Sequence, residues 1–441
     1  MMKHKLYFIL IGLFGFVNLQ AQELLTKAEA VEMALKQNFG IQIAKNNIEI
    51  AENNAGILNS GYLPTLNAQA GANYDIIDRL AEIEGQDPLD QRDLESESFN
   101  AGLNLNYTLF DGLGRFYNYK LLQEQYNLSE LQARETIENT LIQLFSVYYD
   151  VARRFENVQV LKQTLSLSKD RVKRVEYLFE YGQVNKLQVL NADVDVSNDS
   201  INFINEIQNL DNAKRDLQVV INSNEFQDFS VDTSIAFTPM LKIERFVEDY
   251  DLNNVSMLQI EKNLEISAYD QKISKTGYLP TIDLVGSYGW NRNISPETPF
   301  FPGSVQTIDR FAAGISLNWN LFDSGLTAVR IQNARINYEN QELQKKQIQT
   351  EVNRDIQNAL NTYKTRLYIY NLQDQNVQTN IDNFNRTENQ FELGQITSVE
   401  FRQAQVNLQN ARTSYNLAKY DAKLAELQLL QLTGQLLNIE F

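Results

Sequence analysis

The chain has 441 residues, with 39 lysines and arginines against 56 aspartates and glutamates, a formal net charge of −17, one histidine and no cysteine. Without cysteine there is no disulfide, thiolate nucleophile or zinc–cysteine site, and His4 alone provides no catalytic triad and no histidine-ligated metal. The acidic balance argues against nucleic acid as a partner, because that binding rests on cations that neutralise phosphates. A hydrolase with two convergent carboxylates is the remaining enzyme class, and no segment suggests such a pair. We therefore predict no enzyme, no cofactor and no metal.

Residues 1–22 have the order of a secretory signal peptide. Two lysines near the start precede an apolar run over residues 6–17, and polar residues follow up to Gln22. As a helix the run spans about 18 Å, short of the ~30 Å hydrocarbon core that the alternative, a membrane anchor, has to cross. We expect cleavage near Ala21 or Gln22. No later segment approaches about 18 consecutive apolar residues, so the exported chain is expected to be soluble or a barrel.

The chain is a tandem duplication. The motif Gly-Tyr-Leu-Pro-Thr at 61–65 recurs at 277–281, an offset of 216. The motif Leu-Phe-Asp at 109–111 recurs at an offset of 212, and so does Phe-Glu-Tyr-Gly-Gln at 179–183, with one substitution. The change of offset falls within residues 75–98 and, in the second half, 291–310. We expect both of these segments to be surface loops.

This duplication divides the chain into two structural repeats, 23–222 and 246–441. Each is predicted to contain a helix, two strands and a long helical hairpin, in that order. The segment 223–245 between them is either a small strand-bearing equatorial belt or only a connector.

Four stretches alternate between apolar and polar residues, at 64–74, 99–110, 280–290 and 311–322. Period-two alternation over about ten residues, with aromatic residues near the ends, is typical of transmembrane β-strands. The alternative is a half-buried antiparallel sheet on a soluble core. The aromatic residues predicted to face lipid are Tyr74, Tyr107, Trp290 and Trp319. Because four strands cannot close and an open edge is not tolerated in lipid, we expect an oligomer, with eight strands in a dimer or twelve in a trimer.

Long helical patterns follow each pair of strands. Residues 112–181 contain no proline, and apolar residues recur there at alternating spacings of four and three, the a/d pattern of a coiled coil. The members in the first repeat are Ile137, Leu141, Leu144, Tyr148, Val151, Phe155 and Val158, and those in the second are Ile356, Leu360, Tyr363, Leu367 and Tyr370. A helix of about 70 residues is on the order of 100 Å long, so the molecule is predicted to be elongated.

Each long helix is predicted to end at a glycine, Gly182 or Gly394, and to turn into a second helix. Asn185 and Thr397 are the expected N-caps of these second helices, and Glu400 is in the third position of a capping box. The hairpin tips therefore lie near residues 182 and 394. At the other ends of the long helices, Asp111 and Asp323 are expected to cap the transition from strand to helix.

These motifs, in this order and each present twice, resemble the TolC family of bacterial outer-membrane efflux proteins over essentially the whole exported chain. The resemblance implies an α+β membrane protein with long antiparallel coiled-coil hairpins and four transmembrane strands per protomer. It implies a homotrimer with a 12-stranded β-barrel in outer-membrane lipid and an α-helical barrel through the periplasm. The implied function is a passive exit duct of a tripartite efflux or type I secretion system. We expect its pore to be acidic and carboxylate-rich, with Asn, Ser and Gly facing the lumen. The implied partners are a periplasmic adaptor (membrane fusion) protein and an inner-membrane pump of RND or ABC type. The alternative is a soluble periplasmic coiled-coil scaffold.

The resemblance also indicates site residues. Adaptor contacts map to the tips, at Gly182, Gln183, Val184, Gly394, Gln395, Ile396 and Thr397. A gate at the periplasmic entrance maps to Phe391, Glu400 and Gln403, where the family has a tyrosine and two aspartates. Phe391 has no hydroxyl group and only one acidic residue is kept, so a gate centred on a tyrosine is not expected to be preserved. For Glu400, the capping box is the alternative role.

Overall fold

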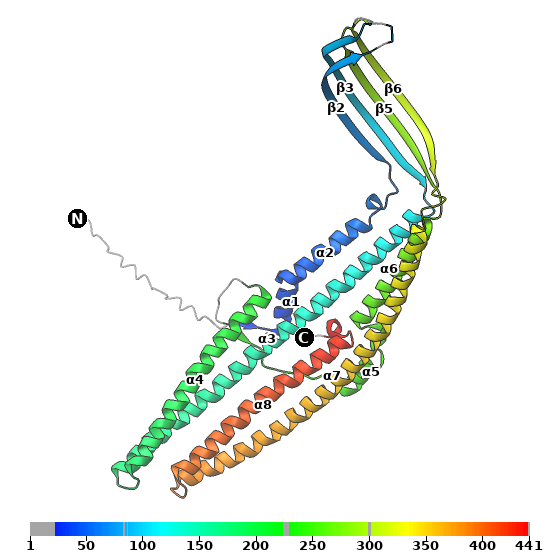
Figure 1. Ribbon diagram of the computed structural model, residues 1–441. Coiled ribbons are helices and arrows are strands. Elements are labelled where there is room, and N and C mark those ends of the chain that lie inside the picture. Colours follow the sequence, from blue (N-terminus) through cyan, green and yellow to red (C-terminus); the bar gives the residue numbers. More distant parts are fainter. Residues whose placement is uncertain (1–22, 83, 86, 224–228, 299–300, 440–441) are drawn as a thin grey trace, which may run out of the picture.

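The computed structural model describes residues 23–82, 84–85, 87–223, 229–298 and 301–439. The predicted signal peptide lies outside these residues. The molecule is elongated, with a four-stranded sheet at one end and the tips of two helical hairpins at the other (Figure 1). Within the described ranges, none of the helices combines the length and the apolar character needed to cross a membrane.

Two long hairpins form the helical half. The first consists of α3 (Gly114–Glu180) and α4 (Lys186–Ile221), and the second of α7 (Leu326–Glu392) and α8 (Ser398–Leu432). At 67 residues each, α3 and α7 are about 100 Å long. Near the tips the packing order is α4–α3–α8–α7. Toward the sheet, α2 (Phe39–Ala55) and α6 (Val255–Thr276) give the order α2–α3–α6–α7.

The heptad residues lie inside this helical layer. Leu141, Leu144, Tyr148 and Val151 are at most 1% exposed, and Ile356 and Tyr363 are completely buried. They belong to one hydrophobic core that also includes residues of α1 (Lys27–Gln37) and α5 (Met240–Glu248). The a/d spacing therefore marks the seam along which the helices pack.

The sheet is antiparallel, in the order β2 (Thr65–Ala81), β3 (Leu89–Phe110), β5 (Thr281–Ser295) and β6 (Ser304–Asn318). Thr65 pairs with Asn106 in the first hairpin, and Thr281 pairs with Asn318 in the second. The two pairs are related by the offsets of 216 and 212 found in the sequence. The duplication therefore extends to the register of the strands.

The strands have different bounds from those predicted. The predicted strands 64–74 and 99–110 become the longer β2 and β3, and 280–290 becomes β5. The predicted strand 311–322 becomes β6, which begins at Ser304 and ends at Asn318. Most of the segments 75–98 and 291–310, expected to be loops, are therefore strand. The reason is that the ladder joins backbone groups, so pairing continues where the apolar alternation has ceased.

A small belt, made of β1 (Glu23–Leu25), β4 (Phe229–Val231) and the ends of the neighbouring helices α1 and α5, packs against the hairpins at mid-height (Figure 1). β1 pairs in parallel with β4, so the segment between the repeats contains a strand as well as the start of α5. The hydroxyl of Tyr148 donates to the carbonyl of Leu25 at 2.8 Å and accepts the N–H of Asp232 at 3.0 Å. An ion pair of 3.1 Å joins Lys27 to Asp232. The belt is thus bonded to the buried face of α3.

Candidate functional site

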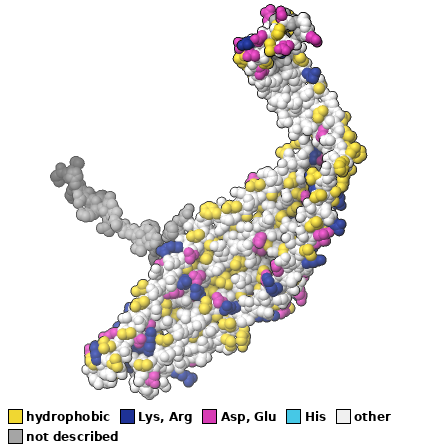
Figure 2. All heavy atoms as spheres, in the orientation of Figure 1, with side chains coloured by type: hydrophobic (Ala, Val, Ile, Leu, Met, Phe, Trp, Pro, Cys, Tyr) yellow, Lys and Arg dark blue, Asp and Glu magenta, His cyan; other side chains and the backbone are white. Residues whose placement is uncertain are grey.

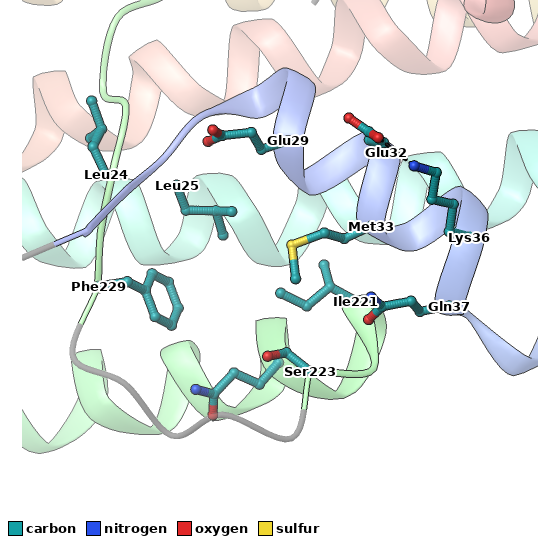
Figure 3. A pocket seen from close by; sticks show the side chains of 11 residues that line it. Leu24, Leu25, Glu29, Glu32, Met33, Lys36, Gln37, Ile221, Ser223 and Phe229 are labelled. Atoms are coloured by element: carbon teal, nitrogen blue, oxygen red, sulfur yellow. Dashed lines mark hydrogen bonds and ion pairs between the residues drawn. The ribbon is translucent and has the colours of Figure 1, made fainter.

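The belt contains a hollow of about 440 Å³ (Figure 3). Leu25, Met33, Ile221 and Phe229 form its apolar wall. Of the carboxylates near it, Glu32 is paired with Lys36 at 2.5 Å, and Glu29 closes the capping box of α1. Its charged groups therefore serve local structure, and it provides no converging pair for acid–base chemistry. In the described part of the chain, no cluster of three or more side chains is suited to hold a metal ion.

Both hairpin tips have the same turn. Gly182 and Gly394 have φ values of 72° and 70°. In the first turn the N–H of Gln183 donates to Leu178 O at 2.8 Å, and in the second that of Gln395 donates to Gln390 O at 2.9 Å. This is the Schellman arrangement, which requires a residue in the left-handed region. A Cβ atom on either glycine would meet nothing within 4 Å, so both turns are open to the outside.

The helices that leave the tips are capped as predicted. The side chain of Asn185 accepts the N–H of Gln188 at 3.2 Å. Thr397 Oγ1 accepts the N–H of Glu400 at 3.2 Å, and Glu400 Oε2 accepts the N–H of Thr397 at 2.8 Å. Hydrogen bonds from the backbone and then the hydroxyl of Thr397 lower the pKa of Glu400. The exposed carboxyl group of Glu400 is therefore ionised at neutral pH.

The opposite ends of α3 and α7 differ slightly from the prediction. Asp111 and Asp323 accept the N–H groups of Arg115 and Thr327, each at 2.8 Å. The N-cap positions belong to Leu113 and Gly325, which have left-handed backbones. The aspartates therefore stabilise these helix starts from two residues earlier, because a tight turn separates strand from helix.

A hydrophobic cluster joins all four helices at the tip. Its buried members are Val175 of α3, Val189 of α4, Phe384 and Phe391 of α7, and Phe401, Ala404 and Leu408 of α8. Phe391 stacks on Phe401 with ring centroids 4.8 Å apart, and Arg174 lies over the Phe391 ring at 5.3 Å. Phe391 is only 8% exposed. The structure therefore places this gate candidate inside the tip cluster, where its apolar ring packs into the seam between the two hairpins.

Next to this cluster lies a buried ionic network. Arg402 of α8 donates two hydrogen bonds of 2.7 Å to Asp199 of α4. Arg171 of α3 forms an ion pair with Asp195, which also lies 3.5 Å from Arg402. Ser168 of α3 donates to Asp199 at 2.5 Å. Asp199 and Arg171 are 2% and 3% exposed. These charges join the first hairpin to the second away from water.

Two arginines of α3 also reach the tip of the second hairpin. Arg174 donates to the carbonyl of Glu392 and, at 3.4 Å, to that of Phe391. Arg171 approaches the carbonyl of Ser398 at 3.5 Å. The carbonyls of Phe391 and Glu392 lie at the C-terminal end of α7, where the helix dipole favours a cation. The hairpins are therefore joined by charge as well as by apolar contact.

The sequence did not reveal this network. Its members come from α3, α4 and α8, and up to 234 residues separate bonded pairs. The spacing of four between Asp195 and Asp199, which puts both carboxylates on one helical face, was the only signal. Charges on such a face usually meet solvent, so the spacing alone does not indicate a partner.

The sheet has one polar and one apolar face. Between the helical half and the register shift at Ile77/Arg79 of β2, the polar face consists mostly of Asn, Gln, Ser, Thr and Gly. The apolar face contains Leu, Ala, Ile and aromatic residues. Tyr74, Tyr107 and Trp290 are on this apolar face, opposite Glu97, Leu284 and Ala101. Trp319 follows β6, and its indole N–H donates to Tyr278 O at 3.1 Å. Acidic side chains gather beyond these faces, at the far end of the sheet (Figure 2).

Both layers of the described chain, the sheet and the helical layer, have two free edges. In the sheet these are β2 and β6. In the helical layer they are α2 and α4 on one side and α7 on the other. Elements of the first repeat thus form one edge throughout, and elements of the second repeat form the other.

A family model described as "Outer membrane efflux protein" matches residues 30–223 and 247–435, most of the chain. The chain belongs to the outer membrane efflux protein family.

Individual relatives of this efflux protein are distant in sequence. It is 22% identical over 383 residues to outer membrane protein TolC of Vibrio cholerae, covering 86% of this chain and 83% of that protein. It is 20% identical to proteases secretion protein PrtF of Dickeya chrysanthemi, covering 70% of this chain and 67% of that protein. Among solved structures, the CmeC outer membrane channel of Campylobacter jejuni matches with a TM-score of 0.73 and 17% identity, covering 93% of this chain and 86% of that one.

The efflux protein is therefore located in the outer membrane and has the fold of this channel family, which confirms the resemblance read from the repeated motifs. Its family consists of channel proteins, not enzymes. At the level of the family, its function is to provide an outer-membrane exit for efflux or secretion.

Proposed function

We propose that three copies of this efflux protein form a passive exit duct, with a 12-stranded barrel in the outer membrane and a helical barrel in the periplasm. The observation that carries the proposal is the pair of unlike free edges, β2 with α2 and α4 on one side, β6 with α7 on the other. Unlike edges associate head to tail, and such contacts produce a ring when the rotation closes. In lipid the sheet must close, and twelve strands leave a lumen whereas eight are filled by side chains.

The internal duplication predicts the register of the missing contact. Gly102 of β3 pairs with Gly289 of β5 inside one protomer. Adding 212 to the first number and subtracting 216 from the second places Gly314 of β6 opposite Asn73 of β2 in the next copy. Both residues are on the polar face, as a closed barrel requires.

A double variant, Gly314→Cys with Asn73→Cys, is expected to form disulfides between protomers and to yield a covalent trimer on a non-reducing gel. Directly opposed residues have Cα atoms about 4.5–5.5 Å apart, within the range of a disulfide. The native chain has no cysteine to interfere, and a Cβ atom on Gly314 meets nothing within 4 Å.

The matched control pairs Gly314→Cys with Gln69→Cys, which moves one thiol by four residues, about 13 Å along the strand. It is expected to remain monomeric under the same oxidant. A monomer from both variants, or equal cross-linking by both, would contradict the proposed ring. A covalent dimer as the final product would contradict the proposed number of three copies in the ring.

We further propose that the tips receive a periplasmic adaptor protein coupled to an inner-membrane pump of RND or ABC type. The open turns at Gly182 and Gly394 support this role, together with Gln183, Val184, Gln395, Ile396 and Thr397 beside them. Phe391, Glu400 and Gln403 remain the proposed entrance residues. Glu400 is ionised and exposed and Gln403 is exposed, and three copies of the carboxylate would favour cations there. The aromatic residues Tyr74, Tyr107, Trp290 and Trp319 are proposed to lie against lipid.

The two kinds of seam around the entrance differ in charge. Within a protomer, Ser168 and Arg171 of α3 contact α8, and Arg174 contacts the end of α7. The positions of α7 related to them by the offset of 212 are Asn380, Asn383 and Arg386. The seam between copies thus has asparagine in place of Arg171, and the position of α4 related to Arg402 is Leu190, so it lacks both arginines of the buried network. We propose that the two hairpins of a protomer move together and that the entrance widens between protomers.

The alternative function, a soluble periplasmic coiled-coil scaffold, is not supported, because the protein is located in the outer membrane.

A further inference from the structure

The polar face of the sheet contains few charges, although the chain as a whole is strongly acidic. Along the described strands between the helical half and the register shift at Ile77/Arg79, its charged residues are Asp75, Asp283 and Arg310. Most other positions are carboxamides, hydroxyls or glycines. The expected pore was acidic and carboxylate-rich, with Asn, Ser and Gly facing the lumen. This face has the Asn, Ser and Gly residues but few carboxylates.

Arg310 is the cation on this face, and like Asp75 it is exposed and has no partner in the described structure. No ion pair or hydrogen bond joins its side chain to any described residue, and it is exposed. Asp283, by contrast, accepts a hydrogen bond of 2.6 Å from Thr108. Asp283 pairs with Ser316, six residues from Arg310 and about 20 Å away along the strand. The two charges therefore act separately.

The neighbours of Arg310 leave its guanidinium group uncovered. Gly289 is directly opposite on β5, and Gly102 is opposite Gly289 on β3. A Cβ atom added to Gly289 would meet only Asn291 Nδ2, at 4.0 Å. The row beside Arg310 thus has no side chain for two strands, and this leaves free space in front of a cation.

We infer that Arg310 contributes a threefold ring of guanidinium groups to the lumen, and that this ring binds the carboxylate, phosphate or sulfate groups of exported anions in passage. The inference rests on the proposed trimer, whose lumen the polar face lines. Rings of arginine or lysine select anions in pores, as rings of aspartate or glutamate select cations. In the register predicted for the trimer, the partner's Ile77 is opposite Arg310. The partner's Asp75 is opposite Ala312 on the same face and is diagonal to Arg310, so one carboxylate of the next copy lies beside each guanidinium group of the ring.

The experiment is a measurement of the permeability ratio of chloride to potassium for the trimer in planar bilayers, from reversal potentials in a KCl gradient. Arg310→Gln is expected to lower the ratio by about twofold or more, the effect of one unit charge about 10 Å from a passing ion in water. Arg310→Lys is expected to keep the ratio. Asp75→Asn, which removes a carboxylate from the same face, is expected to raise it.

The matched control is Arg292→Gln. Arg292 is on β5 opposite Thr307 and on the apolar face, so its loss is expected to leave the ratio unchanged. A conducting Arg310→Gln channel with the wild-type ratio would overturn this inference alone. So would equal effects of Arg310→Gln and Arg292→Gln. A wild-type protein that forms no channel would overturn the trimeric duct and this inference with it.

Discussion

Replacement of Asp199 by alanine is expected to destabilise the helical tip locally by about 3 kcal/mol, because removal of one partner leaves buried charge uncompensated. Asp199 is 2% exposed and accepts two hydrogen bonds of 2.7 Å from Arg402 and one of 2.5 Å from Ser168. Its loss also leaves Arg402 and Arg171 sharing the single carboxylate of Asp195. The long helices remain, since their core near the belt is distant from the tip.

Hydrogen exchange is the measurement, because it reports local opening separately from global unfolding. Protection of amides in the tip portions of α4 and α8 is expected to fall by roughly a hundredfold, and amides near the belt are expected to keep theirs. Asp170→Ala is the control. Asp170 lies on α3 between Ser168 and Arg171, at the same height as the network. Its ion pair with Lys173 is 67–68% exposed and therefore contributes little. Equal loss of protection in the two variants would show that the network does not hold the tip.

Gly434→Ala is expected to be the most damaging single methyl addition in the described chain, with a loss of more than about 4 kcal/mol in the free energy of unfolding. Gly434 has a φ of 68°, and a Cβ atom there would lie 2.1 Å from the carbonyl oxygen of Asn253. The backbone has little freedom to shift, because Arg134 binds the carbonyls of both Asn253 and Gly434, at 3.0 and 2.9 Å. Thr433, next to it, is completely buried.

Denaturant unfolding of Gly434→Ala is best compared with that of Gly394→Ala. Gly394 has nearly the same φ, 70°, but its added methyl group meets nothing within 4 Å. It is expected to cost about 1–2 kcal/mol, the penalty for a left-handed residue with a Cβ atom. The difference between the two variants isolates the steric clash. Similar unfolding midpoints for both would disprove the clash.

Together, the tip network and the contact at Gly434 suggest how rigidity is distributed in this efflux protein. Near the C-terminal end of α8, Gly434 and Arg134 hold the end of the second repeat against α3 and the start of α6. At the tip, Arg402 and Asp199 hold the second hairpin against the first. The chain is therefore fastened at two heights, and in the proposed trimer the seams between copies are the places left to move.

The amino-acid sequence by itself determined the repeat, the heptad seam, the glycine turns and the faces of the strands. These features depend on local periodicity and on the φ values that glycine alone adopts easily, so neighbouring residues are sufficient to specify them. The capping box of Thr397 and Glu400 was visible for the same reason.

Only the tertiary structure decided the length of the strands, the burial of Phe391, the ionic network and the lack of a partner for Arg310 within the described chain. Strand length depends on backbone pairing, which has no side-chain signal once alternation ends. The other three depend on which residues from distant segments become neighbours. Arg402 and Arg310 look alike in the sequence, but one is packed against two aspartates and the other is beside two glycines. The fold alone determines whether each charge is neutralised or remains available.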